Sequence, residues 1–276
     1  MPQAARLLAL ASRLQARAQP PRPTDLQPFV VAGQVVGWTA PDTARFLADR
    51  AMGFEFRSGM LHLADDGMDA AHRSALLADA ALRMRDAGRV RGWRDETLAV
   101  RTEPGGPVLA TIERAACRTL GLCTEAVHLN AFCDDGTLMV ARRAAHKSID
   151  PGLWDNLVGG MVPAGENLEQ ALEREAWEEA GLELDRLEVH RGRSFHVRRP
   201  VAEGYQSERI HVYEVTLPSD AVCTNQDGEV DAIEHWSLPR AVAAIERDAF
   251  TLESALVTLE SLARRGGFVT PAGLYT

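Results

Sequence analysis

One short segment of this sequence carries the acidic residues best suited to chemistry. Residues 159–182 contain six glutamates and a single arginine, Arg174. At about 100° per residue, a helix would bring Glu175, Glu178 and Glu179 into one wedge about 100° wide, where like charges repel one another. Three converging carboxylates with one basic partner are strained unless a cation joins them, and hard oxygen ligands suit Mg²⁺ or Mn²⁺. The segment therefore indicates a divalent-metal site, with an acidic solvated helix face as the alternative.

The helix that must hold these carboxylates has well-defined ends. Asn167 can accept a free backbone amide as the N-cap, and Gln170 can bond back to it in a capping box. Gly181 can adopt the left-handed conformation that ends a helix. We therefore expect a helix over residues 168–180.

The spacing resembles the Nudix box, G-x5-E-x7-R-E-U-x-E-E-x-G-U, in which U is a bulky aliphatic residue. The matching residues are Gly160, Glu166, Arg174, Glu175, Glu178, Glu179, Gly181 and Leu182. Seven fixed positions at roughly 6% usage each would match by chance about once in 10⁸ placements, so the acidic solvated face is set aside. One departure is Ala176, where the family has a larger aliphatic residue, and it affects packing rather than chemistry.

The resemblance implies hydrolysis of a diphosphate linked to another group. It also implies the Nudix α/β/α sandwich with a mixed sheet, here preceded by a small α+β N-terminal domain. The same resemblance makes Glu178 and Glu179 the main metal ligands, with Glu175 as a further ligand or as the base for the attacking water. A diphosphate repels a hydroxide nucleophile, and divalent cations neutralise that charge.

Four further site residues follow from the same resemblance. The carbonyl of Gly159 is expected as an extra metal ligand, and Arg174 and Glu166 as supports that orient the carboxylates. Nudix enzymes also recruit a carboxylate from a later loop, and Glu229 is the acid best placed for that role here. As the alternative, Glu229 is a turn residue.

A wider stretch, residues 140–166, is similar to the Nudix group related to the domain fused to fungal thiamine pyrophosphokinase. That group also carries an N-terminal domain. The similarity implies conversion of a diphosphate to a monophosphate, with thiamine diphosphate or its damaged oxo and oxy analogues as substrates. ADP-ribose or a nucleotide sugar is the alternative substrate.

The β-rich runs 126–133 and 137–142 are joined across Asp134-Asp135-Gly136, whose Asp-Gly pair predicts a hairpin turn. Substrate contacts are expected between this hairpin and the box. Arg142, Arg143 and Lys147 are near enough to reach a bound diphosphate. Trp154 can stack on a flat organic group, although tryptophan is more often a core residue. Isomerisation of an isoprenoid diphosphate would need a cysteine before the box, which residues 154–157 lack, and a ligand sensor would have lost the carboxylates.

The composition and net charge disfavour some classes of binding partner. The chain has 276 residues, 46% of them hydrophobic, and a net charge of −9, which disfavours nucleic acid and anionic membranes as partners. It contains no uninterrupted apolar stretch of about 18 residues. The four cysteines form no CxxC pair, which indicates a reducing, cytoplasmic location.

The first residues allow two interpretations. Residues 1–24 contain four arginines and no acid, which is also typical of an organellar transit segment. We favour an amphipathic helix packed on the first domain. Its apolar residues would be Leu7, Leu8, Leu10, Ala11 and Leu14.

A change in character near Gly121 predicts two domains, 1–120 and 121–276. We expect the first to help recognise the organic group of the substrate, with homodimerisation or stability as its alternative role. Its expected elements are strands over 29–38 with a turn at Gly33, 53–57 and 97–102, and helices over 43–52 and 69–87. For the second domain we expect strands over 126–133, 137–142, 187–198, 209–217 and 234–238, a loop over 144–157, and helices over 168–180, 240–249 and 252–264.

Overall fold

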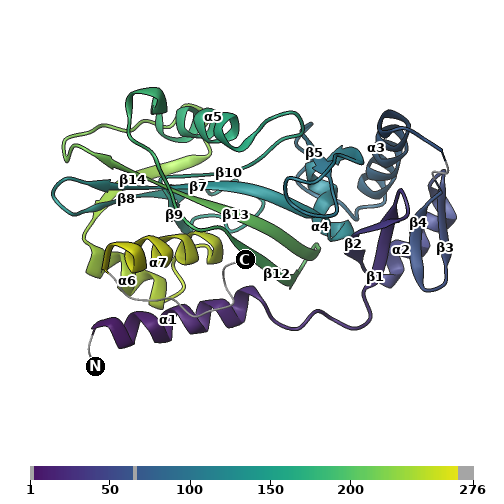
Figure 1. Ribbon diagram of the computed structural model, residues 1–276, viewed down its shortest axis with the longest axis horizontal. Helices are drawn as coiled ribbons and strands as arrows, with labels where there is room; N and C mark the ends of the chain where they lie inside the picture. The colour runs from purple at the N-terminus through teal and green to yellow at the C-terminus, as the bar shows by residue number, and fades with distance from the viewer. Residues whose placement is uncertain (1–2, 65–66, 267–276) are drawn as a thin grey trace.

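An eight-stranded mixed sheet with helices on both faces dominates the structure, a computed structural model that describes residues 3–64 and 67–266 (Figure 1). Helix α5 (Leu168–Ala180) covers one face, and α6 (Leu238–Glu246) and α7 (Leu252–Gly266) cover the other. Alternate residues of the central strand, β7 (Cys123–Cys133), point to opposite faces of the sheet, which lets helices pack on both. Val127 and Leu129 pack in the core under α5, while Ala126 and Phe132 pack in the core under α7. The expected α/β/α sandwich is confirmed.

The strands of the large sheet come from residues 123–236 and belong, with α6 and α7, to the C-terminal unit, residues 123–266. They are β7 (Cys123–Cys133), β8 (Leu138–Arg143), β9 (Trp154–Asn156), β10 (Val158–Met161), β11 (His190–Arg191), β12 (Phe195–Val201), β13 (Gly204–Leu217) and β14 (Val230–Trp236). Strand β13 runs parallel to β7, and the other pairs are antiparallel.

Two sequence-based expectations for this sheet are wrong in detail. The loop expected over 144–157 contains strand β9, which pairs with β8. The strands expected over 187–198 and 209–217 pair as a hairpin, but it turns between Val201 and Gly204, so β12 and β13 extend through residues 199–208, which we expected to be the connection. Strands β9 and β13 carry polar residues that line a cavity, among them Asp155, Gln206 and Glu208, and such residues hide the apolar alternation on which strand prediction depends.

A smaller α+β unit, residues 27–122, precedes the large sheet and is called the N-terminal unit. Its strands are β1 (Gln27–Val31), β2 (Gln34–Thr39), β3 (Phe54–Arg57), β4 (Met60–Leu63), β5 (Thr97–Val100) and β6 (Ala110–Glu113). Its helices are α2 (Pro41–Arg50), α3 (Ala70–Asp86) and α4 (Cys117–Leu120). The predicted turn at Gly33 is confirmed, since Ala32 and Gly33 both have positive φ, 51° and 71°.

Helix α1 (Gln3–Ala18) corrects the expectation for the first residues. It packs against α7 and β12 of the C-terminal unit and not against the N-terminal unit (Figure 1). Leu7, Leu10 and Leu14 are buried in that core, while its arginines pair with acids at the end of α6, as in the 2.6 Å bond from Arg6 Nε to Glu246 Oε1. Across the described ranges, no helix has the length and apolar character needed to cross a membrane.

The packing of α1 predicts a selective loss of stability. We expect Leu14→Ala to lower the free energy of unfolding by about 2–5 kcal/mol, because it leaves a cavity between α1 and α7. Leu8→Ala, on the exposed side of the same helix, is the control and should change it by less than about 0.5 kcal/mol. Urea denaturation measures both, and equal effects would contradict the packing of α1.

Candidate active site

Helix α5 holds the acidic cluster, and its ends are those that the sequence predicts. The Asn167 side chain accepts from the Gln170 amide at 2.9 Å, and Gln170 Oε1 accepts from the Asn167 amide at 3.0 Å. Gly181 ends the helix with φ of 65°. The capping box and Gly181 thus fix where α5 begins and ends.

The three box carboxylates lie in different surroundings. Glu175 and Glu179 are buried, whereas Glu178 is partly exposed. The Gly159 amide of β10 donates to Glu179 Oε2 at 2.8 Å. Gly160 faces the Glu175 carboxyl so closely that an added Cβ would lie 1.9 Å from its Cδ. The missing side chain at Gly160 therefore lets the Glu175 carboxyl approach the strand backbone.

Arg174 joins the acidic residues to one another. Its Nε donates to Glu166 Oε1 at 3.0 Å, and its Nη1 donates to Glu175 Oε1 and to Glu178 Oε2, both at 2.9 Å. Its Nη2 donates to the Met161 carbonyl at 3.3 Å. One guanidinium therefore orients three carboxylates and holds α5 against β10.

This cluster contains more negative charge than Arg174 neutralises. Burial raises the pKa of Glu175 even though Arg174 opposes it. Burial, together with the charge of Glu175, raises the pKa of Glu179 well above its ordinary value. Buried carboxylates with too few positive partners have the chemistry of a binding site for a hard divalent cation.

The described part of the chain holds no set of three Asp, Glu, His or Cys residues already arranged to enclose a metal ion. Arg174 Nη1 donates to both Glu175 and Glu178, so an oxygen of each carboxylate is turned toward the guanidinium. The donor set suits Mg²⁺ or Mn²⁺ in oxygen chemistry and charge, but the side chains must turn to surround it.

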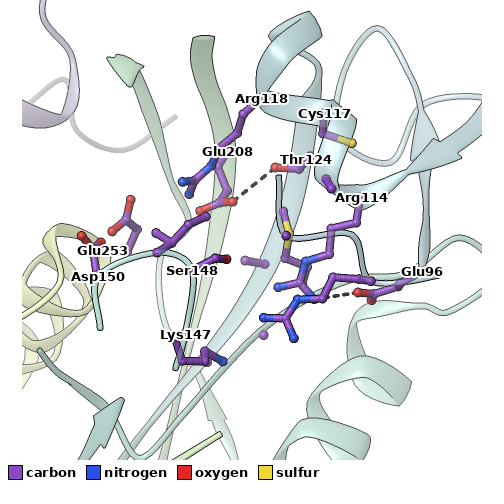
Figure 2. Close-up of a pocket in the computed structure, with 18 of the residues that line it drawn as sticks. Glu96, Arg114, Cys117, Arg118, Thr124, Lys147, Ser148, Asp150, Glu208 and Glu253 are labelled. Carbon is purple, nitrogen blue, oxygen red and sulfur yellow. Dashed lines mark hydrogen bonds and ion pairs between the residues drawn. The ribbon is translucent and has the colours of Figure 1, made fainter. Parts of the chain in front are cut away.

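A cavity of about 480 Å³ opens beside the cluster, at the junction of the two units. Glu175, Glu178 and Arg174 line it, together with Gly159 and Gly160. Figure 2 shows the part farther along the cavity, with Arg114 and Glu96 on one side and Glu253 and Asp150 on the other. Glu179 and Glu166 do not line the cavity but bond to Gly159 and Arg174, which do.

The predicted substrate-binding residues divide into two pairs. Arg143 and Lys147 line the cavity, and Arg143 Nη1 also donates to Asp155 Oδ2 at 3.0 Å. Arg142 and Trp154 do not line it. They are register partners on β8 and β9, so their side chains share the sheet face covered by α6 and α7, where the Trp154 ring lies 4.4 Å from that of Trp236.

Glu229, the predicted extra ligand, lines the cavity but is engaged by two cations. Its carboxylate accepts from Lys147 Nζ and, at 2.8 Å, from Arg94 Nη1. Burial opposes its charge, but these cations hold the pKa of Glu229 below its ordinary value. Its metal-ligand role stays a prediction.

Sequence reasoning missed the polar residues at the part of the cavity shown in Figure 2. Gln206 Nε2 donates to Glu208 Oε1 at 3.2 Å and to Glu253 Oε1 at 2.8 Å, and Thr124 Oγ1 donates to Glu208 Oε2 at 3.3 Å. Burial and the charge of Glu253 raise the pKa of Asp150. Glu253 is itself among the buried residues of α7. A charged residue in an otherwise apolar run of a helix is the signal that could have revealed it.

Two family models match the chain. The NUDIX domain model matches residues 124–256, and the model of a domain of unknown function, DUF4743, matches residues 6–124. Together they account for nearly the whole chain.

Known proteins resemble the chain over different lengths. Nudix hydrolase 20, chloroplastic, of Arabidopsis thaliana is 26% identical over 273 residues, covering 88% of this chain and 69% of that protein. An isopentenyl-diphosphate Delta-isomerase of Leifsonia xyli subsp. xyli is 31% identical over 153 residues, covering 53% of this chain and 79% of that protein. A Deinococcus radiodurans protein of known crystal structure is 28% identical with a TM-score of 0.47, covering 62% of this chain and 98% of that one.

The contact between Gly160 and Glu175 predicts a coupled effect on stability. Gly160→Ala should lower the free energy of unfolding by about 1–3 kcal/mol, because the new methyl group overlaps the Glu175 carboxyl. In a Glu175→Ala background the same substitution should cost much less, because the clash has been removed. A double-mutant cycle by urea denaturation checks this, and an equal cost in both backgrounds would rule out the contact.

Proposed function

Because the chain belongs to the Nudix hydrolase family, we propose that it hydrolyses a small-molecule diphosphate to a monophosphate. The observation that carries the proposal is the pair of buried carboxylates, Glu175 and Glu179, beside a cavity large enough for a small molecule. Glu178, at the cavity surface, completes the set.

In this proposal the carboxylates hold Mg²⁺ or Mn²⁺, and Arg174 and Glu166 orient them. A bound divalent cation supplies positive charge that neutralises the phosphoryl oxygens. Glu175 is a further ligand or the base that accepts a proton from the attacking water. Glu229 joins the ligands only after it releases Lys147 and Arg94, which then become available to the diphosphate.

The acidic part of the cavity supports a thiamine-type substrate. Glu208 and Glu253 are buried at the cavity wall, and Asp150 lies close to Glu253. Buried carboxylates favour an organic group that carries positive charge or several N–H donors, as a thiazolium and an aminopyrimidine do. ADP-ribose and nucleotide sugars carry no such cation, and the described residues that line the cavity include no Phe, Tyr or Trp on which adenine could stack.

Isomerisation, the activity named for the Leifsonia relative, has less support. Cys117 is the cysteine among the described residues that line the cavity, and burial raises its pKa to about 12. A thiol held protonated in this way is a poor acid–base catalyst near neutral pH.

The proposed metal ligands predict a loss of activity that depends on position. Glu178→Gln and Glu179→Gln should each lower kcat by about two orders of magnitude or more, because each removes a charged ligand with little change of shape. Glu173→Gln is the matched control, since Glu173 is exposed on the same helix and its loss changes the net charge equally.

The assay is hydrolysis of a panel of diphosphates at saturating Mg²⁺, with products identified by mass. Turnover of some member by the wild type, lost in the two ligand variants and kept in Glu173→Gln, is the expected pattern. Near wild-type rates in Glu178→Gln or Glu179→Gln would refute the ligand assignment.

The acidic part of the cavity predicts a change in substrate preference. Glu208→Gln should lower the ratio of kcat/KM for thiamine diphosphate to that for ADP-ribose about tenfold or more, since a charge-assisted hydrogen bond contributes about 1.5–3 kcal/mol. Glu188→Gln, at an exposed residue, serves as the control. If Glu208→Gln leaves the ratio unchanged, the organic group is bound elsewhere.

A further inference from the structure

The two units contribute opposite charge to the same cavity. The N-terminal unit supplies four arginines and one glutamate to its lining. The C-terminal unit supplies nine carboxylates and three cations, counting lysine and arginine. The four arginines, here called the arginine wall, are Arg91, Arg94, Arg114 and Arg118.

Arg114 lies at the centre of this wall. Its Nη1 donates to Glu96 at 2.6 Å, a partner in its own unit. Its charge also acts on Glu175 and Glu229 of the C-terminal unit. Arg114 lines the same cavity as Glu175 and Glu178, and Figure 2 shows its side chain beside Glu96, on the side of the cavity that belongs to the N-terminal unit.

Arg94 and Arg118 extend the wall in two directions. Arg94 contacts Glu229, next to Lys147. Arg118 acts on Glu253 and Asp150 in the acidic part. The Arg118 side chain makes no hydrogen bond or ion pair with any other residue that the structure describes. A role in structural ion pairs therefore does not explain why every arginine of the arginine wall is present.

A diphosphate in this cavity would lie between the carboxylates of the C-terminal unit and the arginines of the N-terminal unit. Cations bound to the C-terminal carboxylates can balance only the phosphoryl oxygens turned toward them, and the oxygens turned away need donors of their own. Guanidinium groups match phosphate oxygens in charge and in planar donor geometry. A wall of arginines opposite the carboxylates provides those donors.

We propose that the N-terminal unit forms the anion-binding half of the active site, with Arg114 as its central phosphate contact and Arg94 and Arg118 on its two sides. This inference rests on the proposed diphosphate chemistry and assigns that unit a direct role in it. It gives a reason why the N-terminal unit packs beside the box carboxylates: its arginines then line the cavity in which the substrate binds.

The test measures binding of inorganic diphosphate by calorimetry at a fixed Mg²⁺ concentration, for the full chain and its variants. Arg114→Met, which keeps the aliphatic stem, should weaken binding about tenfold or more. Arg118→Met should weaken it severalfold. Arg57→Met, at an exposed arginine on the outer hairpin of the same unit, is the control and should bind as the wild type does.

Glu96→Gln separates phosphate binding from a structural role. If Arg114 only stabilises the N-terminal unit through its ion pair with Glu96, this variant should lose diphosphate binding as Arg114→Met does, and that result would overturn the proposal. If Arg114 binds phosphate, Glu96→Gln releases the guanidinium and should leave binding unchanged or tighter. If Arg114→Met does not fold, Arg114→Lys and Arg118→Met are compared with the wild type instead. Wild-type affinity for diphosphate in both variants would also overturn the proposal.

Hydrolysis by the wild type is scored separately. Arginine-dependent binding without turnover of any diphosphate would remove the proposed function and leave the anion-binding assignment standing. If the wild type hydrolyses a diphosphate but neither Arg114→Met nor Arg118→Met weakens diphosphate binding, the proposed function stands and the anion-binding assignment is overturned.

Discussion

The guanidinium of Arg174 is the contact on which the site depends. It holds Glu166, Glu175 and Glu178 at hydrogen-bonding distance and also binds a β10 carbonyl, so helix α5 and the sheet are joined through charge. Burying carboxylates costs free energy unless they are paired. Arg174 reduces that cost without cancelling it, and the remaining negative charge is what makes the cluster suited to a cation.

The backbone of β10 is the second part of this arrangement. A side chain at position 160 would collide with the Glu175 carboxyl, so that carboxylate reaches the sheet only because the position is glycine, and a side chain at 159 would press against the His128 ring. Pairing of β10 with β7 fixes that backbone in the middle of the fold. The charged helix is thus held in place by the apolar sheet beneath it, with Val127 and Leu129 in the core under α5.

Much of this could be predicted from local sequence. The ends of α5 follow from Asn167, Gln170 and Gly181, whose capping bonds form within a few residues of the chain. The box spacing places Glu175 and Glu179 on the buried side of α5 because helical periodicity alone decides which residues share a face. The hairpin at Gly136, where φ is 82°, follows from turn chemistry in the same way.

Other features were decided only by the tertiary structure. Arg142 and Arg143 look equivalent in the sequence, yet the pleat of β8 turns one to the α6–α7 face and the other to the cavity. Helix α1 has an apolar face that fits any core, and its ion pairs with Glu246 and Asp248, more than 200 residues away, accompany its packing on the C-terminal unit. Arg114 and Glu208 carry no local signal at all. They meet in one cavity because strand pairing and domain packing bring distant residues together, and short-range patterns in a sequence cannot encode that choice.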